Sequence, residues 1–445
     1  MATQCHNQLT FGFQPKIILN FNGGQITSDA GLLLLRQFDE QLALTKKVKG
    51  LFNDWRNPVF IEHHTHEMLR QRIYQIAAGY EDCDDADTLR SDPTFQTIVG
   101  KSNPLASQPT LSRLENHADE QTNQALGATA LGWFLQHGYP KKYVSKELII
   151  DSDSTDDPCH GQQVFSFFNG AYNQHMYHPL FFFEAHSGCL LSARLRPGNA
   201  HASQNIAEQL RRLVPILKRR FPKTQLSYRA DAGSATPELY KTLESLGLLY
   251  TMGIASNKLF KRRAERWLEK AQRKYVRTKI PIRRFYSFRH RAKTWRKQRR
   301  IIVKIELSAL GTNVRFLITN RPGRAEEIAA WYDQRGECEN RIKEIKCDLQ
   351  AHRLSCHTFQ ANAFRLQLFA LAYQLLILFR RHTLKQTELA KARFDTIRLK
   401  LFKVGARFKR SARRLWFHLS SSWPGRELFI DICRHLRHIA PAASP

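Results

Sequence analysis

Residues 146–254 carry an ordered succession of apolar and polar stretches, and this part of the chain constrains the fold most strongly. ELIIDSDS (147–154) alternates apolar and polar residues and predicts a strand. HPLFFFEAH and CLLSARLRPG, which are separated by Ser187-Gly188, predict a hairpin. Then follow an amphipathic helix (205–220), a strand (226–231), a helix (236–246) and a strand (248–254). We therefore expect an α/β sheet with three antiparallel strands before alternating helices and strands.

This order of elements is that of an RNase H-like sheet. Two more strand-like runs (300–307 and 313–319), a long helix (324–348) and an apolar helix (361–379) follow. We expect five parts along the chain: a helical N-terminal region (1–140), the first part of an RNase H-like core (141–255), a basic strand-rich insertion (256–323), the second part of the core (324–380) and a basic C-terminal region (381–445).

The charge of the chain points to a polyanionic partner. Lys and Arg number 69 against 39 Asp and Glu, a net charge of +30. Residues 258–300 hold nineteen Lys and Arg but two acids, which leaves a local excess of 17, and aromatic residues are interleaved. A second basic zone covers 380–414. A short charge run is usually only a solvated surface, but cations mixed with aromatic rings at this density are typical of a surface that follows a nucleic-acid backbone.

The apolar stretches and the cysteines bear on where the protein works. The longest apolar run, 368–379, is about twelve residues, whereas a bilayer span needs roughly twenty, so we expect no membrane partner. The N-terminus lacks the basic start and apolar core of a secretion signal. The eight cysteines are scattered without a CxxC motif, which suits a reducing cytoplasm.

Two groups of acids lie at the ends of predicted neighbouring strands. Asp151 and Asp153 are two residues apart in one strand, so both point to the same face. Asp231 ends a second strand, within YRADAG. Each acid alone is more often a surface or capping residue. Together they match what phosphoryl transfer requires, because two divalent cations must be held by carboxylates that converge from separate elements.

A third acid is expected from the helix at 324–348. At about 100° per residue, Tyr332, Arg335, Glu339 and Lys346 lie within a stripe roughly 60° wide, and the other late acids, Glu337 and Glu344, fall outside it. An exposed helix with ion pairs at i,i+4 is the ordinary alternative. In the functional interpretation, Arg335 and Lys346 flank a metal-binding carboxylate and grip phosphates.

These residues resemble the Tyr-Arg-Glu-Lys signature of insertion-sequence DDE transposases, and the chain is most similar to the IS-thirteen-eighty family. The similarity covers residues 10–380. Its supporting stretches are SDAGLLLLRQFDE (28–40), GYEDCDDADTLRSDP (79–93), DSDSTDDPCHGQQ (151–163), YHPLFFF (177–183), LRPGNAH (195–201), RADAGSATPEL (229–239) and YDQRGECENRIKEIKCDL (332–349). The resemblance implies an RNase H-like catalytic core, an insertion between the second and third acids, and transposition that depends on Mg²⁺.

The resemblance also implies roles for single residues. Asp153, Asp231 and Glu339 would bind two Mg²⁺ ions, for which Mn²⁺ would substitute. The family's Asp-x-Thr context favours Asp153 as the first acid, with Asp151 as the alternative. The expected DNA contacts are Tyr332, Arg335, Lys346, Trp295, Arg299 and Arg300. For Trp295, stacking on an unpaired base and core packing are both open.

We thus expect a transposase that binds inverted-repeat ends through its N-terminal region and inserts them into target DNA as a homodimer. A bacterial, nucleoid-associated location in the cytoplasm goes with this activity. The alternatives are a nuclease on the same core that does not join strands, and a DNA-binding derivative without catalysis.

Overall fold

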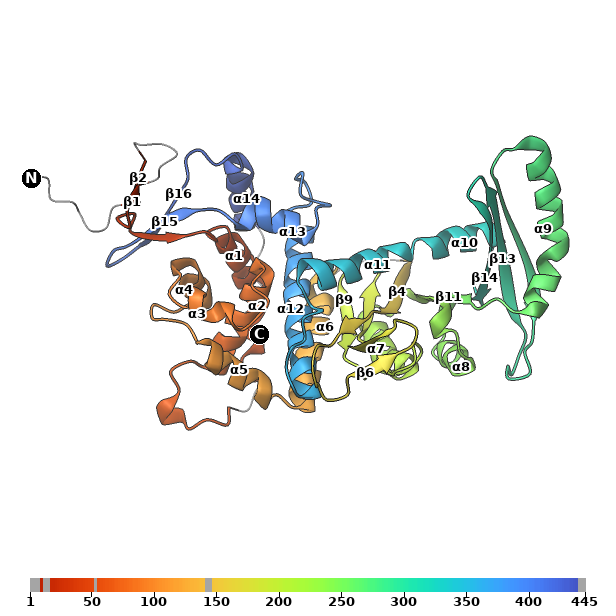
Figure 1. Cartoon of the computed structure of the whole chain (residues 1–445), viewed down its shortest axis with the longest axis horizontal. Coiled ribbons are helices and arrows are strands. Elements are labelled where there is room, and N and C mark those ends of the chain that lie inside the picture. Colours follow the sequence, from red (N-terminus) through yellow and green to blue (C-terminus); the bar gives the residue numbers. More distant parts are fainter. Residues whose placement is uncertain (1–8, 11–16, 52–53, 141–145, 439–445) are drawn as a thin grey trace, which may run out of the picture. The chain divides into compact units, whose positions relative to one another are not determined.

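The computed structural model describes residues 9–10, 17–51, 54–140 and 146–438, and its chain forms two compact units (Figure 1). One unit combines Met1–His117 with Phe379–Pro445, and the other is Ala118–Leu378. This division differs from the five expected parts. The N-terminal and C-terminal regions share a unit, and the boundary before the core lies near residue 117, not 140.

The unit Ala118–Leu378 is built on an eight-stranded sheet with the order β12-β13-β14-β11-β10-β4-β8-β9. Its strands are β4 (Glu147–Ser154), β8 (Leu180–Glu184), β9 (Leu190–Arg194), β10 (Gln225–Ala230), β11 (Leu249–Ile254), β12 (Ile282–His290), β13 (Arg299–Ser308) and β14 (Gly311–Thr319). β4, β10 and β11 are parallel to one another, whereas β8 and β9 continue the sheet in antiparallel pairing. The expected three antiparallel strands followed by alternating helices and strands are confirmed.

The sequence explains why strands β4 and β8 are buried on both faces of the sheet. Leu148, Ile149 and Ile150 form a continuous apolar run, and all three are buried. A strand covered on both faces requires such a run, whereas a strand with one wet face alternates. Every residue of β8 is buried as well. Helices α6 (Glu120–His137), α7 (Ile206–Arg220) and α8 (Pro237–Ser245) belong to the same unit.

The basic insertion is not a separate sheet. Its strands β12–β14 extend the central sheet, because β14 pairs antiparallel with β11. The segment expected to be strand-rich also contains a 21-residue helix, α9 (Lys258–Thr278), which lies along these strands (Figure 1). Phe260, Ala264 and Ala271 are its buried residues and recur at helical spacing, and the Asn257 side chain caps its first turn.

The helix expected at 324–348 is interrupted. It consists of α10 (Ala325–Asp333), α11 (Gly336–Lys343) and a π-helical turn (Glu344–Asp348), with Gln334 and Arg335 between the first two. Gly336, a poor helix former, starts the second piece. The apolar helix expected at 361–379 is longer, α12 (Phe359–Thr383). Among the described residues it is the one helix long and apolar enough to cross a bilayer, yet 94% of its most apolar window is buried.

The unit formed by the chain termini is mainly helical. Its helices are α1 (Leu32–Leu42), α2 (Thr65–Ala78), α3 (Asp85–Leu89), α4 (Pro93–Val99), α5 (Gln108–His117), α13 (Phe394–Ile397) and α14 (Arg426–His438). A three-stranded sheet joins β3 (Gln25–Thr27) to the C-terminal hairpin of β15 (Ala406–Arg410) and β16 (Leu415–Leu419). Lys403 also binds Asp29 at 2.7 Å, so segments nearly 400 residues apart fold together.

Candidate active site

The ends of β4 and β10 bring two acids side by side. The strands are parallel, and Arg229 of β10 is level with Asp151 of β4. Asp153 follows two residues later in β4, and Asp231 directly follows the last residue of β10. Burial raises the pKa of Asp153, and the nearby charge of Asp231 adds to the rise while Arg335 opposes it. The two strands that precede or carry these acids are thus neighbours in the sheet.

Arg335 connects Asp153 to the helix acid Glu339. Its Nη1 donates to Oδ2 of Asp153 at 2.8 Å and its Nη2 to Oε1 of Glu339 at 2.9 Å. Because one guanidinium makes both bonds, the two carboxylate oxygens lie within about 8 Å of each other. Burial acts to lower the pKa of Arg335, but Asp153, Tyr332 and Cys338 together outweigh burial, so the pKa is raised. The Glu339 side chain is 54% exposed, compared with 17% for Asp153.

Asp151, the alternative first acid, has a different environment. It is 1% exposed and accepts two hydrogen bonds from Arg229, each of 2.7 Å. Burial raises its pKa even though Arg229 acts in the opposite direction. Both oxygens are thus occupied inside the protein, whereas Asp153 stands at the edge of the sheet. This geometry favours Asp153 over Asp151 as a ligand-binding acid.

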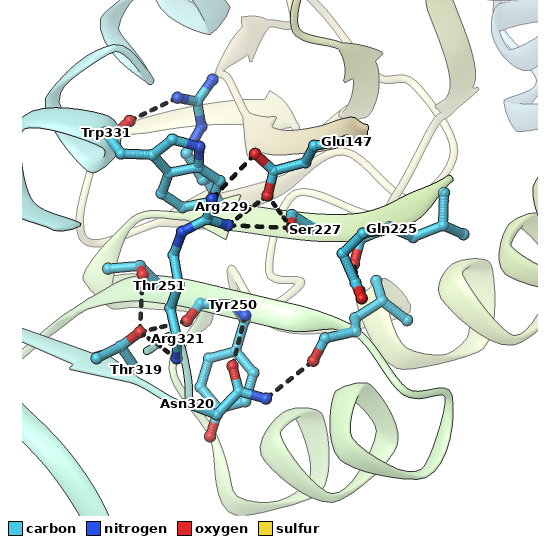
Figure 2. A network of polar contacts seen from close by, with 12 residues as sticks. Glu147, Gln225, Ser227, Arg229, Tyr250, Thr251, Thr319, Asn320, Arg321 and Trp331 are labelled. Atoms are coloured by element: carbon cyan, nitrogen blue, oxygen red, sulfur yellow. Dashed lines mark hydrogen bonds and ion pairs between the residues drawn. The ribbon is translucent and has the colours of Figure 1, made fainter. Parts of the chain in front are cut away.

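The sheet also holds α10 in place through Trp331. Arg229 donates to the Trp331 carbonyl oxygen at 2.7 Å and lies 5.0 Å from the centre of its ring. Arg321 lies 4.2 Å from the same ring and pairs with Glu147 of β4 (Figure 2). Cation–π contacts from two guanidinium groups therefore fix the residue beside Tyr332. This arrangement holds the end of α10, which directly precedes Arg335 and the helix α11 that carries Glu339.

The other two members of the helix stripe are also held. Lys346 donates to Oδ1 of Asp156 at 2.5 Å, and Asp156 accepts a second bond from Gln174. Burial acts to raise the pKa of Asp156, but the hydrogen bonds from Lys346 and Gln174 together with the charge of Lys346 outweigh burial, so the pKa is lowered. Burial raises the pKa of Tyr332, and Asp231 contributes, which places the phenol near that acid.

The remaining expected DNA contacts are mostly turned inward. Trp295 is 7% exposed and packs edge-on against Tyr240, with ring centres 5.5 Å apart. Arg299 is buried and pairs with Glu244 at 2.9 Å. Only Arg300 keeps a partly exposed side chain, which donates to the Gly323 carbonyl. For Trp295 the structure therefore favours core packing over base stacking, and Arg299 does not lie where DNA phosphates could reach it.

Metal binding can be tested against the donor set. In the described residues, no three Asp, Glu, His or Cys side chains are close enough together to share a metal ion. The chemistry nevertheless fits a hard divalent cation, because Asp153, Asp231 and Glu339 all offer carboxylate oxygen. The guanidinium of Arg335 stands between two of these carboxylates as a positive charge. Arg335 and a divalent cation would thus exclude each other at this position.

Sequence reasoning missed Asp156, Arg229 and Trp331. The signal for Asp156 was present in DSDSTDDP, three residues after Asp153. The roles of Arg229 and Trp331 depend on the pairing of β4 with β10, which no single-segment pattern reveals. The only indication in the sequence was a cationic residue, Arg229, in the strand predicted next to the strand that carries Asp151 and Asp153.

The chain was compared with known protein families, curated proteins and solved structures. A search of curated proteins found no match. Among solved structures, the chain is similar to a piggyBac transposase synaptic complex with hairpin DNA, with 11% identity, coverage of 94% of this chain and 87% of that chain, and a TM-score of 0.43. It is also similar to a Mos1 transposase paired-end complex with the left transposon end, with 13% identity, 46% and 64% coverage and a TM-score of 0.18. A family model described as "transposase DDE domain group 1" matches residues 9–441. The chain therefore belongs to this family of DDE transposases.

Proposed function

We propose that this protein is the transposase of an insertion sequence of the Tyr-Arg-Glu-Lys group, resembling the IS-thirteen-eighty family, and that it cuts and joins DNA at Asp153, Asp231 and Glu339. One observation carries the proposal. Asp153 lies near the end of β4, Asp231 directly follows the neighbouring parallel strand β10, and Arg335 links Asp153 to Glu339. The order β9-β8-β4-β10-β11, with β8 and β9 antiparallel, supports an RNase H-like core.

Each residue has a distinct part in the proposed mechanism. Asp153, Asp231 and Glu339 would hold two Mg²⁺ ions, or Mn²⁺ in their place, which supply positive charge at the attacking and leaving oxygens when bound. The pairing of β4 with β10 positions both aspartates. Glu339, being exposed on α11, can approach them once Arg335 releases it. The released Arg335, and Lys346 if it leaves Asp156, can then bind phosphates on either side of the scissile bond.

The surface of α9 supports DNA binding by the insertion. Its nine Lys and Arg side chains are all exposed, and among the described residues none forms an ion pair with a carboxylate. Trp267 stacks on Tyr286 with ring centres 4.7 Å apart. A cavity of about 720 Å³ beside them is lined by Lys270, Ala271, Arg273, Lys274, Arg277, Ile282, Arg284 and Tyr286. Such a surface gives affinity for the DNA backbone that falls with rising salt.

The partners follow from the reaction. The two inverted-repeat ends of the element must be brought together and joined to target DNA, and we propose that a homodimer does this. DNA bound over α9 and the acids would keep the protein associated with the bacterial nucleoid.

A strand-transfer assay tests the proposed function. Purified protein is mixed with a duplex of the inverted repeat that flanks its gene, a supercoiled target plasmid and Mg²⁺. We expect joined products in which the repeat is inserted into the plasmid, and none with Asp231→Asn although end binding persists. Breaks without insertions would identify a nuclease instead, and binding without cleavage in Mg²⁺ or Mn²⁺ would identify a non-catalytic derivative.

A further inference from the structure

The three-stranded sheet β3-β15-β16 has one packed face and one open face. In β15, Ala406 and Phe408 point inward and are buried, and Phe408 packs on Phe417 with ring centres 5.0 Å apart. Side chains alternate along a strand, so Arg407 and Lys409 point outward. Pairing sets the outward residues of the neighbouring strands beside them. The open face therefore consists of Ile26, Arg407, Lys409, Trp416 and His418, all exposed.

This face is strongly and uniformly positive. Residues 396–426 contain nine Lys and Arg and no acid. Lys400 and Lys403 pair with acids from outside this segment, Glu388 and Asp29. The five cations of the hairpin are Arg407, Lys409, Arg410, Arg413 and Arg414, and among the described residues none of them forms an ion pair with a carboxylate. Mutual repulsion of this kind costs stability unless a polyanion balances it.

Flat aromatic surface accompanies the charge. Trp416 is 45% exposed, and its ring is nearly parallel to that of His418, with centres 6.1 Å apart. The guanidinium of Arg414, in the turn between the strands, lies 5.8 Å from the Trp416 ring. A large aromatic side chain left on a solvent-facing strand is unfavourable in isolation. Stacked against cations, it is suited to lie along sugars and base edges.

We infer that the open face of the β3-β15-β16 sheet docks on double-helical DNA. A two-stranded ribbon fits the major groove, which is about 12 Å wide, and the cations at its edges and turn meet the phosphates. The inference rests on the proposed function and assigns duplex binding to one face of the C-terminal hairpin, whereas the sequence indicated only a basic zone at 380–414 and assigned recognition of the ends to the N-terminal region. β3 is the N-terminal contribution to this surface.

Charge-neutralising variants test the assignment by fluorescence anisotropy. The probe is a fluorescein-labelled duplex of arbitrary sequence, about thirty base pairs long, with its single strand as competitor, measured at several salt concentrations without divalent metal. We expect Arg407→Gln with Lys409→Gln to weaken duplex binding about ten-fold or more at about 0.1 M salt. The slope of log affinity against log salt should shrink by about 1.8, since each lost phosphate contact removes about 0.9.

Two further variants make the test specific. Lys46→Gln with Lys49→Gln removes the same charge from exposed positions of the same unit, and should change affinity by less than about three-fold. Arg413→Gln with Arg414→Gln lies in the turn, outside the strands, and should weaken binding even if the strand variant fails to fold.

Three outcomes would decide against the inference. Equal losses in the hairpin and control variants would show a general charge effect and overturn it. So would unchanged binding by both hairpin variants, or a wild-type preference for the single strand. If the wild-type protein bound no duplex at all, the proposed function itself would fail. Duplex binding that does not depend on the hairpin would leave that function standing and remove only this surface.

Discussion

Arg335 and Asp153 form an ion pair of 2.8 Å between the start of α11 and the end of β4, and the same guanidinium reaches Glu339 at 2.9 Å. A single guanidinium thus contacts two carboxylates, Asp153 and Glu339. The consequence is a competition. A divalent cation held by Asp153 and Glu339 would compete with Arg335 for their carboxylates, and the guanidinium would then be available to bind a phosphate.

Replacing Arg335 tests this competition. Arg335→Gln leaves Asp153 beside Asp231 without a cationic partner, so we expect the metal-free protein to lose about 1–3 kcal/mol of stability. Added Mn²⁺ should then raise the thermal unfolding midpoint more in the variant than in the wild type, since the competing guanidinium is gone. The exposed Glu337→Gln on the same helix serves as control. An equal Mn²⁺ effect in the variant and the wild type would contradict the competition.

Asn substitutions at Asp151 and Asp153 should have different effects on stability and cleavage. Asp151→Asn removes the partner of Arg229, which is 1% exposed, and an uncompensated buried charge costs about 3–5 kcal/mol. Asp153→Asn should leave the fold nearly intact but abolish strand cleavage. Thermal unfolding and cleavage are measured on both variants, with activity scaled to the folded fraction. Loss of cleavage in a well-folded Asp151→Asn, with active Asp153→Asn, would reverse the assignment.

Stability should fall in mild acid because of His178. Burial lowers the pKa of His178 to about 4, and the charge of Arg196 acts in the same direction. The unfolded chain binds a proton on this residue below about pH 6.5, but the folded protein does so only near pH 4. The contribution of neutral His178 to the free energy of unfolding is therefore fully present above about pH 6.5. About 3 kcal/mol of this free energy is lost as the pH falls to about 4.

The matched variant for this prediction is His178→Gln, which cannot take up the proton. Urea unfolding of both proteins between pH 4 and 7 isolates the effect, since every other titrating group is shared. The difference in unfolding free energy between the two proteins should change across this range. A constant difference would show that His178 is not the group responsible.

The sequence predicted the sheet better than the helices around it. The strands of 146–254 were recognisable because continuous apolar runs such as LFFF are required where both faces are covered. The helix α9 was not expected, since its dense Lys and Arg obscured the helical spacing of Phe260, Ala264 and Ala271. Local patterns also gave no indication that β3 pairs with β15, because that contact joins residues almost 400 positions apart.

For the candidate site too, the sequence predicted contacts within one segment but not contacts between distant segments. Helical geometry correctly grouped Arg335 with Glu339, since i,i+4 neighbours share a face, and the structure joins them by a hydrogen bond. Helical geometry could not identify the acidic residues in other segments that pair with the helix cations. Arg335 and Lys346 were expected to be free for phosphates, but Asp153 and Asp156 hold them. For Trp295, the sequence left base stacking and core packing open, and tertiary packing buries its ring.

The most direct test of the three-acid site compares Glu339→Gln with Glu337→Gln. Both residues lie in the first turn of α11 and are exposed, but only Glu339 contacts Arg335 beside Asp153. Cleavage of inverted-repeat duplex in Mg²⁺ is measured together with duplex binding. The account predicts no cleavage but wild-type binding for Glu339→Gln, and retained cleavage for Glu337→Gln. Wild-type cleavage by Glu339→Gln would contradict it.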